Sequence, residues 1–235
     1  MRSVFVAGTD TEVGKTFVSC ALLRALREDG HRAVGMKPVA SGCLQTSNGL
    51  RNEDALALID ASDPRPDYAD CNPFAFVEAV SPHIAAGQMR TEVAMEPIEA
   101  AYARLADQAD TVVVEGVGGW QAPLSSRLLA NALPQTLKLP VILVVGLKLG
   151  CLNHAQLSAR AIVDDGCELL GWIGNRIDPA MLRPEENIDT LRRLLPVPCL
   201  GMVGHGASPE SAAASLSAAV DSIRASRGLF KEKTP

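Results

Sequence analysis

The chain has 235 residues, of which 47% are hydrophobic, 21% charged and 4% aromatic, and its formal net charge is −5. These proportions are typical of a globular domain and exclude a disordered or collagen-like chain. No apolar run reaches the roughly 18 residues of a membrane span. Lysine and arginine form no stripe that would follow a phosphate backbone. We therefore predict a cytoplasmic protein that binds neither a membrane nor nucleic acid.

Short β-branched runs alternate along the chain with longer segments of helical periodicity. The expected strands cover residues 4–7, 33–36, 111–115, 141–145, 170–174 and 200–203. The expected helices cover residues 15–28, 96–108, 153–163, 184–195 and 209–227. This alternation predicts an α/β fold with a mostly parallel, twisted sheet and helices on both faces. Ligands of such sheets bind beyond the carboxyl ends of the strands.

A phosphate-binding loop follows the first expected strand, where residues 8–16 read GTDTEVGKT before an apolar helix. Its backbone N–H groups would converge on phosphate oxygens, Lys15 would add a positive charge, and the Thr16 hydroxyl could bind Mg²⁺. The usual G-x-x-x-x-G-K-[ST] spacing puts glycine at position 9, where this chain has Thr9. The loop is therefore a longer variant.

The loop and the element order together predict a single P-loop NTPase domain. We expect this domain to cover residues 1–228 and residues 229–235 to form a loose C-terminal tail. The six cysteines are far apart and include no C-x-x-C pair, so we expect reduced thiols and no metal site built on cysteine.

Charged residues stand at two further strand ends. Lys37 ends the second expected strand and would point an ammonium group into the same crevice, unless it lies in solvent. Glu115 ends the third, just before glycines, which is where many nucleotide hydrolases hold Mg²⁺. Asp54 precedes an apolar run, and the local sequence alone does not decide between a metal ligand and a helix cap.

Two more candidate sites follow the later strands. Residues 149–154 lead into a helix, whose free N–H groups would form a second anion site suited to a substrate carboxylate. Asn175 and Arg176 follow the strand at 170–174, where a side-chain amide can match the edge of adenine. His83 and His154 are expected at helix starts or in packing, since neither has an evident catalytic partner in the sequence.

Taken together, these motifs closely resemble the dethiobiotin synthetase family of biotin biosynthesis. The matching segments are GTDTEVGKT at 8–16, KPVASG at 37–42, RNEDALAL at 51–58, SPHIAA at 81–86, VEGVGGW at 114–120, PVILVVGLKLGCLNH at 140–154 and GW at 171–172. They follow the family's order, which is far more specific than a phosphate loop alone.

The resemblance implies a homodimeric, ATP- and Mg²⁺-dependent ligase. Members of this family join CO₂ to 7,8-diaminononanoate and close a cyclic urea, while ATP becomes ADP and phosphate. One amine forms a carbamate, the γ-phosphoryl group activates it as a mixed anhydride, and the second amine expels phosphate. Two lysines and a magnesium ion suit this chemistry, because phosphoryl transfer depends on positioning and cations.

The resemblance also implies residue roles, motif by motif. The catalytic residues would be Lys37, Lys15 and Thr11, and the Mg²⁺ ligands would be Thr16, Asp54 and Glu115. The nucleotide would bind Glu12, Val13, Gly14, Lys15, Thr16, Phe17, Asp54, Glu115, Gly116, Val117, Gly118, Asn175 and Arg176. The diamine end of the substrate would contact Thr11 and Ser41. Its carboxylate would rest on Gly150, Cys151, Leu152 and Asn153 from the other subunit.

The chain departs from the family pattern near its end. Where the family usually has a proline-led segment over the adenine, this chain reads GMVGHG at 201–206. Two extra glycines loosen that loop. The adenine contacts of Gly204, His205, Gly206 and Glu210 therefore stay open, and so does the nucleotide preference.

A regulatory ATPase of the partition or iron-protein type is the competing interpretation, because such proteins share the sheet and a phosphate loop. These switches usually carry a lysine near the start of the loop, where this chain has Asp10 followed by Thr11 and Glu12. The sequence therefore argues against a switch. A small-molecule kinase is a third possibility, but a kinase would leave a stable phosphorylated product and need no CO₂ site.

Overall fold

The computed structural model describes residues 2–226, and a six-stranded parallel sheet lies at their centre. The strand order is β10-β9-β8-β1-β7-β2. The strands are β1 (Val4–Gly8), β2 (Ala33–Met36), β7 (Thr111–Glu115), β8 (Val141–Gly146), β9 (Leu169–Asn175) and β10 (Cys199–Val203). The predicted parallel α/β sheet is confirmed.

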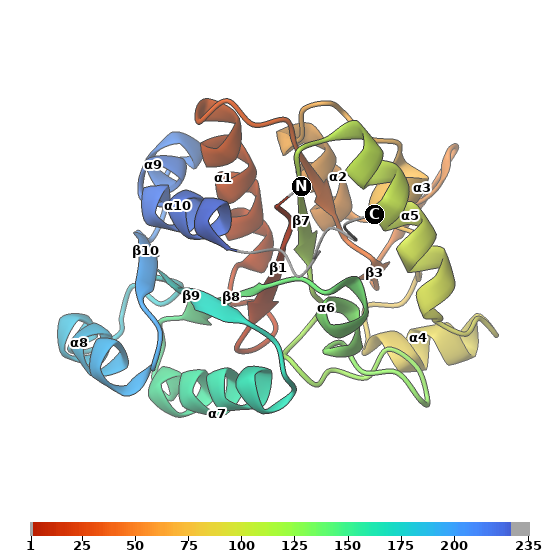
Figure 1. Ribbon diagram of the computed structural model, residues 1–235. Helices are drawn as coiled ribbons and strands as arrows, with labels where there is room; N and C mark the ends of the chain where they lie inside the picture. The colour runs from red at the N-terminus through yellow and green to blue at the C-terminus, as the bar shows by residue number, and fades with distance from the viewer. Residues whose placement is uncertain (1, 227–235) are drawn as a thin grey trace, which may run out of the picture.

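Helices cover both faces of the sheet, as Figure 1 shows for α1 and α10 on one side and α7 on the other. One layer contains α1 (Lys15–Glu28), α2 (Glu53–Ala61), α9 (Pro209–Ala214) and α10 (Ser217–Ala225). The opposite layer contains α4 (Pro82–Gln88), α5 (Met95–Gln108), α6 (Ala132–Leu137), α7 (Cys151–Asp164) and α8 (Pro184–Leu194). Between β2 and α4 lie β3 (Val39–Ala40), β4 (Leu44–Thr46), β5 (Gly49–Arg51), α3 (Tyr68–Cys71) and β6 (Phe74–Ala75).

The central strands are apolar on both faces because each face packs against a helix layer. In β1, Val4 and Val6 join the core on one side, while Phe5 and Ala7 join the core on the other. This division follows from the alternation of side chains along a strand. All five residues of β7 and all six of β8 are buried.

One predicted helix is wrong. The segment expected to be helical over 209–227 forms two helices, α9 and α10, with a break at Ser215 and Leu216. The break buries Leu216 completely and brings the Ser215 carbonyl against Gly201 of β10. Residue 227 and the tail predicted at 229–235 lie outside the described residues.

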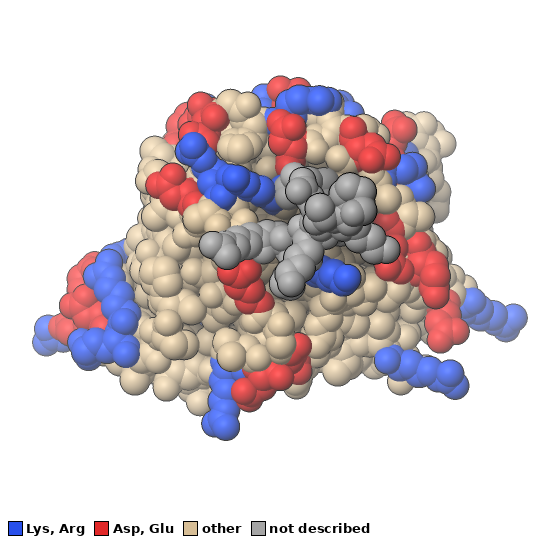
Figure 2. Space-filling view, viewed as in Figure 1, with Lys and Arg blue, Asp and Glu red and all other residues tan. Residues whose placement is uncertain are grey.

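The surface also agrees with the composition. Figure 2 shows acidic and basic side chains interspersed on the face that it presents, without a basic stripe. All six cysteines lie within the described residues, and each is a free thiol. Within residues 2–226, no helix combines the length and the apolar character that crossing a membrane requires.

Candidate functional site

The carboxyl ends of β1, β7 and β2, which are neighbours in the sheet, border a cleft of about 400 Å³. Its lining residues are Thr11, Glu12, Gly14, Lys15, Thr16, Lys37, Ala40, Ser41, Asn52, Asp54, Glu115, Val117 and Gly118. All of these except Ala40 and Asn52 were expected from the sequence. The predicted phosphate loop, second lysine and candidate metal ligands therefore share one cleft.

The phosphate loop is shaped by Gly14, which precedes α1 with a φ of 81°. The Asn175 side chain donates a hydrogen bond from Nδ2 to the Val13 carbonyl at 3.0 Å. A Cβ at position 14 would lie 2.1 Å from that nitrogen, so both the backbone angle and the packing require glycine. Asn175 thus supports the loop in this structure, a role that sequence reasoning did not include.

Lys15 folds back over its own loop. Its Nζ donates to the carbonyl oxygens of Asp10 at 2.9 Å and Gly118 at 2.8 Å. Burial lowers the pKa of Lys15 to about 8, and the nearby Lys37 acts in the same direction. The amine is therefore still mostly protonated near neutral pH but is close to its titration range.

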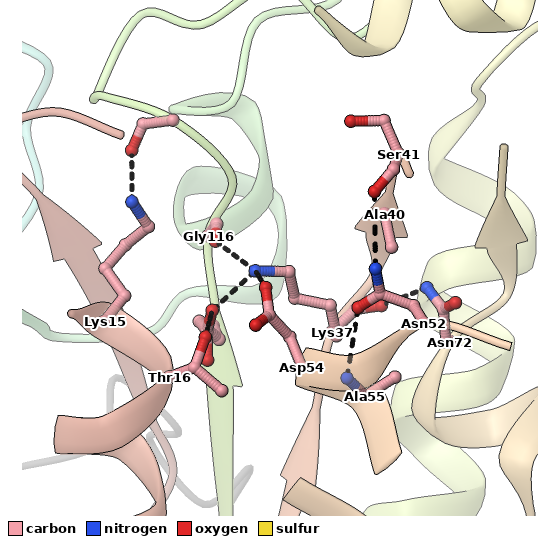
Figure 3. Close-up of polar contacts among 12 residues, drawn as sticks. Lys15, Thr16, Lys37, Ala40, Ser41, Asn52, Asp54, Ala55, Asn72 and Gly116 are labelled. Atoms are coloured by element: carbon pink, nitrogen blue, oxygen red, sulfur yellow. Dashed lines mark hydrogen bonds and ion pairs between the residues drawn. The ribbon is translucent and has the colours of Figure 1, made fainter. Parts of the chain in front are cut away.

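Lys37 lies at the end of β2 and is only 4% exposed, so the solvent alternative is wrong. Its Nζ is 2.5 Å from Glu115 Oε1, 3.0 Å from Asp54 Oδ2 and 3.3 Å from the Gly116 carbonyl. Figure 3 shows this side chain pointing to Asp54 and Gly116. Burial opposes the charge, but the Glu115 and Asp54 carboxylates outweigh it and hold the pKa of Lys37 above its ordinary value.

The two carboxylate oxygens of Glu115 differ in their hydrogen bonding. Oε1 accepts hydrogen bonds from Thr16 Oγ1 at 2.8 Å and from Lys37. Oε2 is buried and finds no hydrogen-bond partner within the described residues. A buried carboxylate oxygen of this kind needs a ligand, and Mg²⁺ prefers carboxylate and hydroxyl oxygens. The donors of Thr16, Asp54 and Glu115 therefore fit a magnesium ion.

Residues 2–226 contain no cluster of three or more His, Cys, Asp and Glu side chains arranged to hold a metal. Magnesium is commonly held by one or two carboxylates together with water and substrate phosphates. Such an ion would therefore depend on the nucleotide as much as on the protein.

Asp54 does not cap α2. The cap is Asn52, whose side chain accepts a hydrogen bond from the Ala55 N–H at 3.2 Å. Asp54 lies in the first turn and faces Lys37 at the site. Burial opposes the charge of Asp54, yet the Lys37 ammonium holds the pKa of that carboxyl below its ordinary value. The helix-cap interpretation of Asp54 is therefore wrong, and asparagine's preference for helix starts could have identified Asn52.

Two asparagines that sequence reasoning missed fix the backbone around Lys37 and Ser41. Asn72, which is 3% exposed, donates from Nδ2 to the Lys37 carbonyl at 2.7 Å. The Tyr68 hydroxyl donates to Asn72 Oδ1 at 2.9 Å. Asn52 Nδ2 donates to the Ser41 carbonyl at 3.3 Å. These contacts join the end of β2 to α2 and α3 (Figure 3).

Other predicted site residues lie apart from the cleft. Phe17 lies along a different groove, which also contains Cys20 and Arg24. The Arg176 guanidinium donates to the Glu185 carboxylate. His205 Nδ1 is 3.1 Å from the Arg176 carbonyl. Glu210 pairs with Arg24.

The segment Gly150–Asn153 starts α7 and lies outside the lining of the cleft that the described residues form. The Cys151 N–H already donates to the Lys148 carbonyl at 3.0 Å, so the expectation of free N–H groups is wrong at that residue. Lys148 Nζ is 3.4 Å from Asp10 Oδ2, a contact that sequence reasoning missed. The start of α7 is thereby connected to the phosphate loop of its own chain.

His83 and His154 both lie at helix starts, as expected. His83 is in the first turn of α4, where its Nδ1 is 2.9 Å from Ser81 Oγ. His154 is in the first turn of α7.

The amino-acid sequence matches known proteins over most of its length. A family model described as an AAA domain matches residues 2–208. The ATP-dependent dethiobiotin synthetase BioD of Xanthomonas euvesicatoria pv. vesicatoria (strain 85-10) is 58% identical over 199 residues, covering 85% of this chain and 89% of that protein. The protein of the same name from Xylella fastidiosa (strain 9a5c) is 55% identical over 219 residues, covering 92% and 97%.

Solved structures share the fold at low sequence identity. The cell division ATPase MinD of Pyrococcus furiosus has a TM-score of 0.55 and 17% identity, covering 95% of this chain and 99% of that chain. The MinC:MinD complex of Aquifex aeolicus gives 0.54 and 15%, covering 95% of each chain. This likeness concerns the P-loop NTPase fold alone.

Proposed function

The chain belongs to the ATP-dependent dethiobiotin synthetase family, and we propose how its cleft carries out that ATP-dependent ring closure. The regulatory ATPase alternative is not favoured, because the relatives above half identity are synthetases, whereas the likeness to MinD extends only to the fold. The observation that carries the proposal is the Lys37 ammonium, buried between Glu115 and Asp54 beside the phosphate loop.

The substrates are 7,8-diaminononanoate, CO₂ and ATP. One amine attacks CO₂ and loses a proton, which gives a carbamate held by the Lys37 ammonium near Thr11 and Ser41. A carbamate oxygen attacks the γ-phosphorus, and ADP leaves. The second amine then attacks the carbonyl carbon of the mixed anhydride, phosphate leaves, and the cyclic urea closes with loss of a proton. Lys37 and Lys15 stabilise the negative charge on the transferring group.

The triphosphate lies along the phosphate loop. Residues Glu12–Thr16 with Gly116–Gly118 would surround it, and Asn175 with Arg176 would contact the adenine. Thr16, Asp54 and Glu115 would hold Mg²⁺, which would supply positive charge beside the phosphate oxygens. The unpartnered Oε2 of Glu115 supports this assignment.

The enzyme works as a homodimer in this proposal, with Gly150–Asn153 of the partner subunit binding the substrate carboxylate. Two exposed apolar side chains beside that segment support it, since Leu149 is 93% and Leu157 60% exposed. Single exposed leucines are ordinary, but two next to a predicted ligand site favour a covering surface. A cytoplasmic location stays an expectation from the sequence.

The test measures ATP hydrolysis and product formation with bicarbonate and the diamine supplied singly and together. A synthetase requires both for full turnover and releases one phosphate per ring formed. A kinase consumes ATP without bicarbonate and leaves a phosphorylated compound. A regulatory ATPase turns over ATP without either substrate. Rapid ATP turnover that is indifferent to both would contradict the proposal.

A further inference from the structure

A hydrogen-bonded cluster at Trp120 directly follows the loop whose carbonyl oxygens accept hydrogen bonds from both active-site lysines. Trp120 Nε1 donates to Asp165 Oδ2 at 2.7 Å, and Asn131 Nδ2 donates to the same oxygen at 2.7 Å. The indole is 5% exposed. Asp165 directly follows α7, and Asn131 directly precedes α6. The cluster therefore joins the end of α7 to the loop at Trp120 and to the start of α6.

The loop from Gly116 to Gly119 connects this cluster to the cleft. Its Gly116 carbonyl accepts from Lys37 and its Gly118 carbonyl accepts from Lys15. At one end the loop continues from β7, where the Gly116 N–H donates to the Val6 carbonyl at 3.0 Å. At the other end the next side chain is Trp120. The position of both carbonyl oxygens thus depends on how the chain is fixed at each end.

Packing connects the two ends of the loop. The Phe5 ring of β1 meets the Trp120 indole edge to face, with centroids 6.3 Å apart and planes at 79°. A Cβ at Gly116 would lie 2.8 Å from the tip of the same ring. Phe5 therefore fills the space between Gly116 and Trp120. A tilt of the indole would therefore displace Gly116 through the Phe5 ring, because close-packed interiors transmit small shifts.

We propose that Trp120 and Asp165 are positioning residues, which hold the Gly116–Gly119 loop so that its carbonyls place the Lys15 and Lys37 ammonium groups for phosphoryl transfer. This inference rests on the catalytic roles proposed for the two lysines. The competing explanation is that the Trp120–Asp165 bond only attaches α7 to the core. The two explanations predict different turnover per folded molecule when the Trp120–Asp165 bond is removed.

Matched variants separate these explanations. Trp120→Phe removes the N–H and keeps an aromatic ring, while Asp165→Ala removes the acceptor and Asp165→Asn keeps an acceptor oxygen. Asp164→Ala is the control, because this neighbouring carboxylate is exposed and pairs only with Arg160 among the described residues. Asn131→Ala removes the second donor without touching Trp120.

We expect Trp120→Phe and Asp165→Ala each to lower kcat roughly tenfold, with a smaller change in KM for ATP, because misplaced catalytic groups act mainly on the transition state. The double variant should be no worse than either single one, since both remove the same bond. Asp165→Asn, Asn131→Ala and Asp164→Ala should each keep at least about half of the parent kcat.

Indole N–H resonances give a second readout that does not depend on activity. The chain has two tryptophans, and Trp172 Nε1 is buried without a hydrogen-bond partner in the described residues, so its resonance serves as an internal reference. Asp165→Ala should shift only the Trp120 signal, which Asp165→Asn should largely restore. This measurement stays informative if Trp120→Phe folds poorly.

The inference is overturned if Trp120→Phe and Asp165→Ala lose thermal stability but keep kcat within about twofold of the parent, since the bond is then only structural. An unmoved Trp120 resonance in Asp165→Ala would overturn it as well. Lys37→Gln distinguishes a failure of this inference from a failure of the proposed function. Loss of activity in Lys37→Gln with full activity in both cluster variants rejects this inference alone, whereas activity retained in Lys37→Gln rejects the proposed function.

Discussion

The carboxyl edge of the sheet has two halves, which differ in the burial and pairing of their side chains. In the phosphate half, at the ends of β1, β2 and β7, Lys37 and Glu115 are 4% and 1% exposed and contact each other. In the outer half, beyond β8, β9 and β10, Leu149 is 93% and Leu182 85% exposed. One half pairs its buried charged groups with each other, and the other leaves large apolar side chains in solvent.

This difference indicates which part of the site the proposed partner subunit would complete. The phosphate half is held by bonds among its own residues, so it is preorganised for a nucleotide before any ligand arrives. In the outer half, the partly exposed Lys148–Asp10 pair connects the start of α7 to the phosphate loop. Exposed pairs of this kind contribute little stability. The outer half is therefore where a partner subunit would act.

The largest expected effect follows from removing the central charge of the phosphate half. Lys37→Gln should lower turnover by at least ~10²-fold, because a preorganised cation at a developing negative charge contributes roughly 3 kcal/mol. Steady-state kinetics on protein shown to be folded by circular dichroism measures this loss. Lys138→Gln is the control, because Lys138 is exposed and lies outside the lining of the cleft. Turnover above about a third of the parent would show that Lys37 is not catalytic.

A second prediction concerns the unpartnered oxygen of Glu115. Glu115→Gln should raise the Mg²⁺ concentration needed for half-maximal activity roughly tenfold or more, since a neutral amide replaces a charged ligand. Titration of activity with Mg²⁺ at saturating ATP measures the shift, and Asp54→Asn tests the other carboxylate in the same way. A titration that matches the parent would remove the altered residue from the metal site.

A third prediction tests whether the outer half is completed by a partner. Lys37→Gln damages the chemistry and Gly150→Trp would block the carboxylate site, so each homodimer should be inactive. In a mixed dimer both lesions fall in one site and the other site stays intact. Equal amounts of the two variants form about half mixed dimers, so activity should recover to roughly a quarter of the parent.

The complementation needs one control. Each variant must first be shown to be folded and dimeric, because the tryptophan could also break the interface. Given that control and verified subunit exchange, an absence of recovery means that each site is built within one chain. The role proposed for Gly150–Asn153 of the partner subunit would then be wrong.

The same two halves show what the sequence could predict. Lys37 and Glu115 were identifiable because each ends a short segment predicted as a strand, and the ends of adjacent parallel strands meet at one edge. The sequence did not reveal that Asn72 holds the Lys37 carbonyl, because Asn72 lies 35 residues away among elements too short to show a periodicity. The Trp120–Asp165 bond, across 45 residues, was hidden as well, because one bond between a loop residue and the end of a predicted helix leaves no periodic signal.

The outer half was harder to predict because its side chains have competing partners. Arg176, for which an adenine contact stays a prediction, pairs with Glu185 of α8, and the sequence did not show that pair. The adenine contact of Asn175 stays a prediction as well, and its amide also donates to the Val13 carbonyl of the phosphate loop, which the sequence did not show. The break at Ser215 depends on the close approach of Gly201, and a tertiary contact of that kind leaves no local signal.

The smallest expected effect concerns the glycines that make the outer half of this chain unusual. At Gly204 an added Cβ would meet no described atom within 4 Å, and the backbone is not left-handed. Gly204→Ala should therefore raise stability by ~0.4–1 kcal/mol, by restricting the unfolded chain. Gly201→Ala, three residues earlier, would put its Cβ 2.6 Å from the Ser215 carbonyl and should lower stability by ~1–3 kcal/mol. Thermal unfolding of both variants beside the parent measures this contrast. If Gly204→Ala melts below the parent, position 204 packs against another surface, and the outer half is less open than its exposed leucines indicate.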